Sequence, residues 1–127
     1  TTEYPCAFAP SGSANVTVTM YTPSNVALSV DQYWQGYCLP EYEAVFDSFT
    51  VSEQVVEGTI GVEKATKNAK TYTFEGTIGG KTYQYKQTVI VHSSLIYCIT
   101  YTALASDGSF AQYESDYQAM LDSFIFR

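Results

Sequence analysis

The sequence is poor in positive charge. Its 127 residues include six Lys and Arg against thirteen Asp and Glu, which gives a formal net charge of −7. Proteins that hold a nucleic-acid backbone neutralise its phosphates with Lys and Arg, and anionic membrane surfaces attract the same side chains. The composition therefore argues against nucleic acid as a partner. All five lysines fall within residues 64–86, where we expect a solvated hairpin edge rather than a binding patch.

Histidine and cysteine are also scarce. The chain has one His and three cysteines, Cys6, Cys38 and Cys98, with no Cys-x-x-Cys pair and no Cys/His spacing of a zinc site. A calcium loop of the D-x-D-x-D-G type is absent as well. We therefore predict no metal and no cofactor. The cysteines are interpreted as small buried hydrophobes, with one disulfide among them, or an intermolecular role for the odd one, left open.

Long hydrophobic runs are missing. No segment approaches the roughly 18 apolar residues that a membrane span needs. No leader is recognisable either, which is typical of a cytosolic chain or of a mature form whose leader has been removed. The length predicts a single domain over residues 1–127. Twelve tyrosines and an aromatic content of 16% favour an exported protein.

Residues 71–124 carry the clearest structural pattern. Two alternating strands flank Gly79-Gly80, and such a pair suits a two-residue turn because both glycines can adopt positive φ. This turn predicts that Phe74 faces Tyr85 and that Gly76 faces Tyr83. Apolar and polar side chains then separate onto opposite faces of the hairpin, which supports the register.

A third strand and a helix follow the hairpin. A three-residue connection at 92–94 would pair Val89 with Tyr97 and Tyr85 with Tyr101. Beyond it, Asp107 or Ser109 is the predicted N-cap of an amphipathic helix. We therefore predict one shared face, covered by this helix. The sheet residues are Phe74, Tyr85, Val89, Tyr97, Ile99 and Tyr101, and the helix residues are Tyr113, Tyr117, Met120, Leu121 and Phe124.

The first half of the chain predicts a hairpin and helical segments. Residues 4–8 and 15–21 alternate as strands do. Ser29 and Gln32 have capping-box spacing for a helix to Cys38, and Pro40 is expected to interrupt it and to open a second helical piece. Strand-like runs follow at 50–57 and 59–62. Together these elements predict an α+β fold, an antiparallel meander with helices packed on its faces.

Three parts of the sequence suggest catalytic motifs but lack features that those motifs require. The Gly-Gly-Lys-Thr run at 79–82 lacks the earlier glycine and the following helix of a phosphate-binding loop. His92, beside Ser93 and Ser94, has no nucleophile elbow near it. The carboxylates of residues 41, 43 and 47 form the exposed face of a predicted helix. We therefore predict that the chain is not an enzyme.

One aromatic set allows a different interpretation. Trp34 and Tyr37 on the first helix, together with Tyr83 on the sheet, could line a pocket between that helix and the sheet. In this alternative the chain is a small-ligand-binding protein or an enzyme. A stripe of aromatic residues at helical spacing is more often part of a core, and the two interpretations differ in whether Trp34 borders an open cavity.

Four stretches resemble the PsbP-like superfamily, in particular its secreted, bacterial, lipoprotein-like members of unknown function. They are Asn15–Val18, Tyr33-Trp34, Tyr97–Ala103 and Tyr117–Phe124. The resemblance implies an antiparallel sheet between helices, an α/β/α sandwich. The family includes photosystem II extrinsic subunits and a nuclear-import factor that binds a small GTPase. Its longer N-terminal hairpin with a Gly-Trp is absent here, so the chain would lack the first strand or two.

This resemblance implies a non-enzymatic interaction or accessory domain outside the cytoplasm, secreted or at the cell surface. A lipid anchor upstream of Thr1 would be compatible with it. The expected partner is an unidentified protein, and the expected state is a monomer or a weak dimer. An unpaired sheet edge near the N-terminus would offer one place for a partner strand.

Overall fold

The computed structural model describes residues 6–8, 12–21, 29–52, 55–58, 69–92 and 95–122. Within these ranges, seven strands form one antiparallel sheet in the order β1-β2-β7-β6-β5-β3, with β4 pairing the start of β5. The strands are β1 (Cys6–Phe8), β2 (Asn15–Tyr21), β3 (Ser48–Val51), β4 (Val56–Gly58), β5 (Ala69–Ile78), β6 (Lys81–His92) and β7 (Leu95–Leu104). The predicted α+β class, with an antiparallel sheet, is confirmed.

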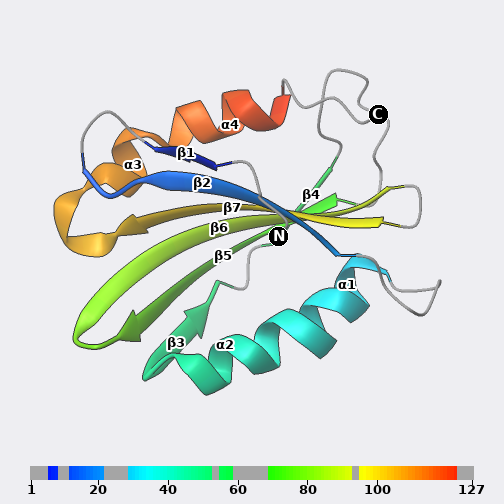
Figure 1. The fold of residues 1–127 in the computed structure, drawn as a ribbon, viewed down its shortest axis with the longest axis horizontal. Helices are drawn as coiled ribbons and strands as arrows, with labels where there is room; N and C mark the ends of the chain where they lie inside the picture. The colour runs from blue at the N-terminus through cyan, green and yellow to red at the C-terminus, as the bar shows by residue number, and fades with distance from the viewer. Residues whose placement is uncertain are drawn as a thin grey trace.

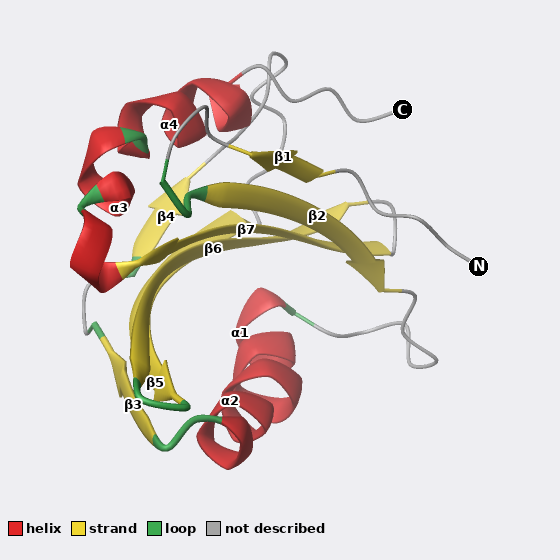
Figure 2. Cartoon of the chain, turned by 60° about the vertical axis from the view of Figure 1, so that its left-hand side comes forward, coloured by secondary structure: helices red, strands yellow, loops and turns green. Residues whose placement is uncertain are grey.

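Helices lie on both faces of the strongly curved sheet (Figures 1 and 2). The concave face holds α1 (Val30–Tyr33), the π-helical η1 (Trp34–Cys38) and α2 (Leu39–Val45). The convex face carries α3 (Ser109–Gln112) and α4 (Glu114–Asp122), which follow the 3₁₀ turn η2 (Ala105–Asp107). None of the described helices is long and apolar enough to cross a membrane.

Each face has its own buried cluster. The concave core contains Val30, Trp34, Cys38, Tyr72, Phe74, Val89, Ile96 and Cys98. The convex core contains Ala14, Val16, Ala69, Ile90, Ile99, Tyr101, Ala103, Tyr117 and Leu121. Because successive side chains of a strand point to opposite faces, β6 and β7 contribute to both cores.

The predicted β5–β6 register is confirmed. Phe74 pairs with Tyr85, Gly76 with Tyr83, and Ile78 with Lys81 across the Gly79-Gly80 turn. Both glycines have positive φ, 59° and 79°, as the turn requires. The ring of Phe46 lies directly over the bare backbone of Gly76.

The predicted β6–β7 register is wrong by one residue. His92 pairs with Leu95, so that Val89 faces Cys98 and Tyr85 faces Thr102. A slip of one residue moves every side chain to the other face. The predicted shared face is therefore split between the two sides of the sheet. Phe74, Tyr85 and Val89 lie in or against the concave core, and Tyr97, Ile99 and Tyr101 lie in or against the convex core.

The first helix is continuous where a break was expected at Pro40. Ser29 and Gln32 form the predicted capping box. The helix then widens into η1, where the Leu39 N–H donates to the carbonyl oxygen of Trp34, five residues back. Pro40 follows as the second residue of α2. Since proline lacks an N–H and crowds the preceding turn, this π-turn accommodates it without ending the helix.

The predicted C-terminal helix forms in two pieces, α3 and α4, separated at Tyr113. Gly108, at φ 72°, precedes α3, and Asp107 supplies the capping oxygen by accepting from the Ser109 N–H at 2.9 Å. Tyr117 and Leu121 face the sheet as predicted, whereas Met120 is exposed. Phe124, placed on this helix by the sequence pattern, lies outside the described residues.

Candidate functional site

Trp34 lies at the centre of a stack of aromatic rings between the first helix and the sheet. Its ring is parallel to that of Tyr72 at a centroid distance of 4.0 Å, and Phe74 and Tyr42 lie at 5.4 and 5.9 Å. Only 4% of Trp34 is exposed. The space beneath this tryptophan is therefore filled by neighbouring rings.

The other two predicted ligand-binding residues have different neighbours. Tyr37 is 50% exposed and stacks on Tyr33 at 5.7 Å. Tyr83 is half-buried on β6, with its ring 6.4 Å from that of Tyr85. Neither of the two surface depressions described below is lined by Trp34, Tyr37 or Tyr83. Their joint role in binding a ligand stays a prediction.

A buried polar network borders these rings. Gln87 is buried on the concave side of β6, and its Nε2 donates to the Tyr42 hydroxyl and to Thr100 Oγ1, each at 3.0 Å. Burial raises the pKa of Tyr42 above its ordinary value, so its hydroxyl stays protonated at neutral pH. The network satisfies the polar atoms that the concave face buries at this point.

Two thiols meet in the middle of the same helix, one turn after Trp34. Cys38 ends η1, Cys98 lies in β7, and both are free and buried. Their side chains hydrogen-bond to each other, and the hydroxyl of Tyr33 hydrogen-bonds to both. The hydrogen bond to Cys98 and burial raise the pKa of Cys38, which keeps its thiol protonated. The sequence could not reveal this pair, because the residues are far apart in the chain and belong to unlike elements.

A depression of about 470 Å³ opens between α2 and β3. Its lining is Leu39, Glu43, Phe46, Asp47, Phe49 and Val51. Two aromatic rings and two aliphatic side chains form its apolar part, and two carboxylates stand beside them. Phe46 and Phe49 are parallel, with ring centroids 5.8 Å apart. Such a lining combines an apolar surface with negative charge.

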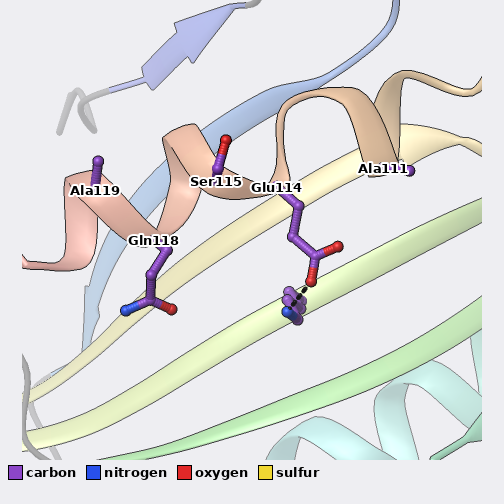
Figure 3. A pocket seen from close by; sticks show the side chains of 6 residues that line it. Ala111, Glu114, Ser115, Gln118 and Ala119 are labelled. Atoms are coloured by element: carbon purple, nitrogen blue, oxygen red, sulfur yellow. Dashed lines mark hydrogen bonds and ion pairs between the residues drawn. The ribbon is translucent and has the colours of Figure 1, made fainter.

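A second depression, of about 600 Å³, lies on the convex face between β6 and the C-terminal helices (Figure 3). Its lining is Lys86, Ala111, Glu114, Ser115, Gln118 and Ala119. Glu114 reaches down to the strand and forms an ion pair with Lys86, and Gln118 points toward the same strand (Figure 3). The lysine charge is therefore already compensated within the molecule.

Asp107 gathers the strongest set of hydrogen bonds at the surface. One carboxylate oxygen accepts from the Ser109 N–H and hydroxyl, and the other accepts from the Ser13 N–H and hydroxyl. These bonds, with the Ser109 hydroxyl foremost, lower the pKa of Asp107 to about 2. The carboxylate ties the loop before β2 to the start of α3, a structural role.

Among the described residues, no group of three or more His, Cys, Asp or Glu side chains is arranged to hold a metal ion. The polar side chains instead form local pairs and small networks. Within the described part of the chain, two surface depressions and one buried thiol pair are therefore places where function could reside.

Comparison with known proteins gives the fold and no family. No protein-family model matches the chain, and no curated protein matches it. Among solved structures, the fold is similar to that of PA94 from Pseudomonas aeruginosa, described as a protein of unknown function for which a regulatory role is suggested. The TM-score is 0.73 at 13% sequence identity, and the match covers 98% of this chain and 83% of that one. At this identity the likeness concerns the fold alone.

Proposed function

We propose that the chain is a non-enzymatic, PsbP-like interaction or accessory domain that works outside the bacterial cytoplasm. Its support is the sheet with helices on both faces, the sequence stretches that resemble secreted PsbP-like proteins, and an acidic composition rich in tyrosine. The proposal assigns function to surfaces rather than to a catalytic centre.

One observation supports the non-enzymatic part: several polar side chains of the described residues, Asp31 and Tyr117 among them, are engaged in structural contacts. Asp31 accepts from Lys70 at 2.7 Å and from the Tyr72 hydroxyl at 3.2 Å. The Tyr117 hydroxyl, buried in the convex core, lies 2.8 Å from the Thr88 hydroxyl and donates to the Ile99 carbonyl at 2.9 Å. Catalytic groups need a free lone pair or proton directed toward a substrate, and these groups direct theirs into the fold.

Cell fractionation tests the location. A C-terminally tagged copy expressed from its own gene should appear in the medium, on the outer surface or in the periplasm, and should be accessible to protease added to intact cells or, for a periplasmic protein, to spheroplasts. A tagged protein that stays in the cytosol and is protected from protease would contradict the proposal. A cytosolic protein of known location, probed in the same samples, controls for lysis.

Site-specific crosslinking tests the interaction. A photoreactive amino acid at exposed Val45 on α2, or at exposed Met120 on α4, samples helices on the two opposite faces of the sheet. A partner should give one adduct of defined mass in living cells at one position and none at the other. The same substitution at buried Val89 is the control. Adducts at neither surface position, nor at exposed Met20 on β2, would count against an interaction domain.

The depression between α2 and β3 favours a second candidate function, binding of a small ligand between the first helix and the sheet. Its apolar rings and two carboxylates suit an amphiphile that carries a positive charge. A series of alkylammonium compounds, titrated against the protein by NMR, should shift resonances of residues 39–51 if this function is real. Shifts that are unchanged in Glu43→Gln, or that are spread over both faces, would exclude it.

A further inference from the structure

We propose that Cys38 and Cys98 are oxidised to an intramolecular disulfide that fastens the first helix to the middle of the sheet. The bond would join η1 to β7 across the concave core. It would give the chain a reduced form, in which only packing and hydrogen bonds hold the helix, and an oxidised form, in which the helix is covalently attached.

Helix geometry directs Cys38 at the sheet. Val30, Trp34 and Cys38 are spaced four residues apart, so they lie on the same side of the helix, and all three are buried in the concave core. On β7, Cys98 points to the same core, between its sheet neighbours Val89 on β6 and Thr19 on β2. The packing of the first helix against the concave face therefore buries the two thiols in the same core.

Hydrogen bonds already join the two side chains. Each thiol hydrogen-bonds to the other, and Tyr33, one helical turn before the end of η1, hydrogen-bonds to both. Thr19 adds a hydrogen bond to Cys98. A disulfide requires Cα atoms about 4.4–6.8 Å apart, and interacting thiols on a helix and a strand that face each other in one core favour such an approach.

The reaction is a pair of thiol–disulfide exchanges with a disulfide donor, either a dithiol oxidoreductase in its oxidised form or glutathione disulfide. One cysteine, as the thiolate, attacks the donor disulfide, and a mixed disulfide forms as one donor thiolate leaves. The second cysteine loses its proton to water and attacks the mixed disulfide, expelling the other donor thiolate. Two protein thiols are oxidised and one donor disulfide is reduced. Because both thiols are buried in the folded chain, the exchange occurs while the helix is docking.

The experiment uses the full chain with Cys6→Ser, which removes the remaining cysteine. The protein is unfolded, reduced, and refolded in a glutathione buffer that contains both redox forms. Free thiols are then alkylated and the protein is digested with trypsin. The lysines at 64 and 86 place Cys38 in fragment 1–64 and Cys98 in fragment 87–127. The expected product is these two fragments joined, two hydrogen atoms lighter than their sum and separated by dithiothreitol.

Denaturation supplies the second measurement. The oxidised Cys6→Ser protein should unfold at a higher urea concentration than the same protein with reductant. The double variants Cys6→Ser/Cys38→Ser and Cys6→Ser/Cys98→Ser should show no such difference. Full alkylation of both cysteines after oxidative refolding would overturn the proposal. So would a disulfide that joins two chains, or one that lowers the urea midpoint.

Discussion

Gly76 occupies a position in β5 where a side chain has no room. A Cβ atom built at this residue would lie 2.6 Å from Cδ1 of Phe46, far inside van der Waals contact. Gly76→Ala should therefore push the Phe46 ring away and lower the free energy of unfolding by about 1–3 kcal/mol, the usual cost of overpacking. Urea denaturation followed by tryptophan fluorescence measures the change.

Gly36 provides the matched control for this substitution. It is exposed within η1, and nothing lies within 4 Å of the place that a Cβ atom would occupy. Gly36→Ala should raise the free energy of unfolding by about 0.5–1 kcal/mol, because alanine loses less backbone entropy in a helix. If both variants shifted the urea midpoint in the same direction, the contact between Phe46 and Gly76 would not be the cause of the change in Gly76→Ala.

Asp107 predicts a dependence of stability on acid. Its folded-state pKa, about 2, lies below the ordinary value of 3.8. Its contribution to stability is therefore complete above about pH 4 and disappears as the pH falls through 2. Urea midpoints of the wild type and Asp107→Asn should differ most above pH 4, and the difference should narrow toward pH 2. Asp31, whose pKa Lys70 also lowers, is present in both proteins, so its contribution cancels in the difference between their urea midpoints.

A charge-removing control separates this effect from general electrostatics. Glu43→Gln removes one negative charge from exposed α2, away from the serines that bind Asp107. The difference in urea midpoint between the wild type and Glu43→Gln should not narrow toward pH 2. A difference between the wild type and Asp107→Asn that stays constant from pH 5 to pH 2 would contradict the assigned hydrogen bonds.

At the scale of elements, the first helix packs against the sheet through one of its sides. Trp34 faces the sheet and is buried among the rings of Tyr42, Tyr72 and Phe74, whereas Tyr37 on the next turn is half exposed. Trp34→Ala should lower the free energy of unfolding by about 3–5 kcal/mol, as expected for a large buried ring. Tyr37→Ala should change it by no more than about 1 kcal/mol. Chemical denaturation monitored by circular dichroism compares the two.

Trp34→Phe keeps the test decisive if the alanine variant fails to fold. Phenylalanine retains part of the contact with Tyr72, so its midpoint should lie between those of the wild type and Trp34→Ala. Equal shifts for Trp34→Phe and Tyr37→Ala would show that the concave core does not depend on the tryptophan. A Trp34→Ala protein that folds with an unchanged free energy of unfolding would instead support the predicted ligand pocket beside this residue.

The two hairpins of the meander show why one register could be predicted and the next could not. The β5–β6 hairpin alternates polar and apolar residues around a glycine turn, so its phase is visible in the sequence. In β6 and β7, the runs Val89–Val91 and Leu95–Ile99 are mostly apolar at consecutive positions, because helices bury both faces of the sheet there. Alternation then does not show which side chains share a face. The predicted three-residue connection is one residue longer than the observed one.

The candidate sites depended on tertiary contacts that sequence spacing does not encode. The location of Trp34 on a helix was predicted, but its burial under Tyr72 and Phe74 depends on where the helix docks. The pairing of Cys38 with Cys98 depends further on the β2–β7 order and on the π-turn at Pro40. A rule that treats proline only as a helix breaker misses that turn, because it ignores the wider hydrogen bonds that accommodate the ring.

At the scale of the whole molecule, the fold pairs two lysines of the basic segment with carboxylates from other parts of the chain. Lys70 pairs with Asp31 of the first helix, and Lys86 pairs with Glu114 of the last. With a net charge of −7, we expect no binding to a fluorescently labelled single-stranded oligonucleotide in an anisotropy titration at low salt. Saturable binding that weakens as salt rises would contradict this expectation, since such behaviour requires lysines available to phosphate.

The place of β2 in the sheet also sets the order in which the molecule can be completed. Val16 in β2 pairs with Tyr101 in β7, although more than half of the chain is synthesised between them. At roughly 5–20 residues per second, a ribosome needs about 4–17 s to make that interval. Throughout that time the first hairpin has no neighbouring strand. A nascent chain that stops before Leu95 lacks the strand that joins β2 to β6, so the sheet can close only after β7 has been synthesised.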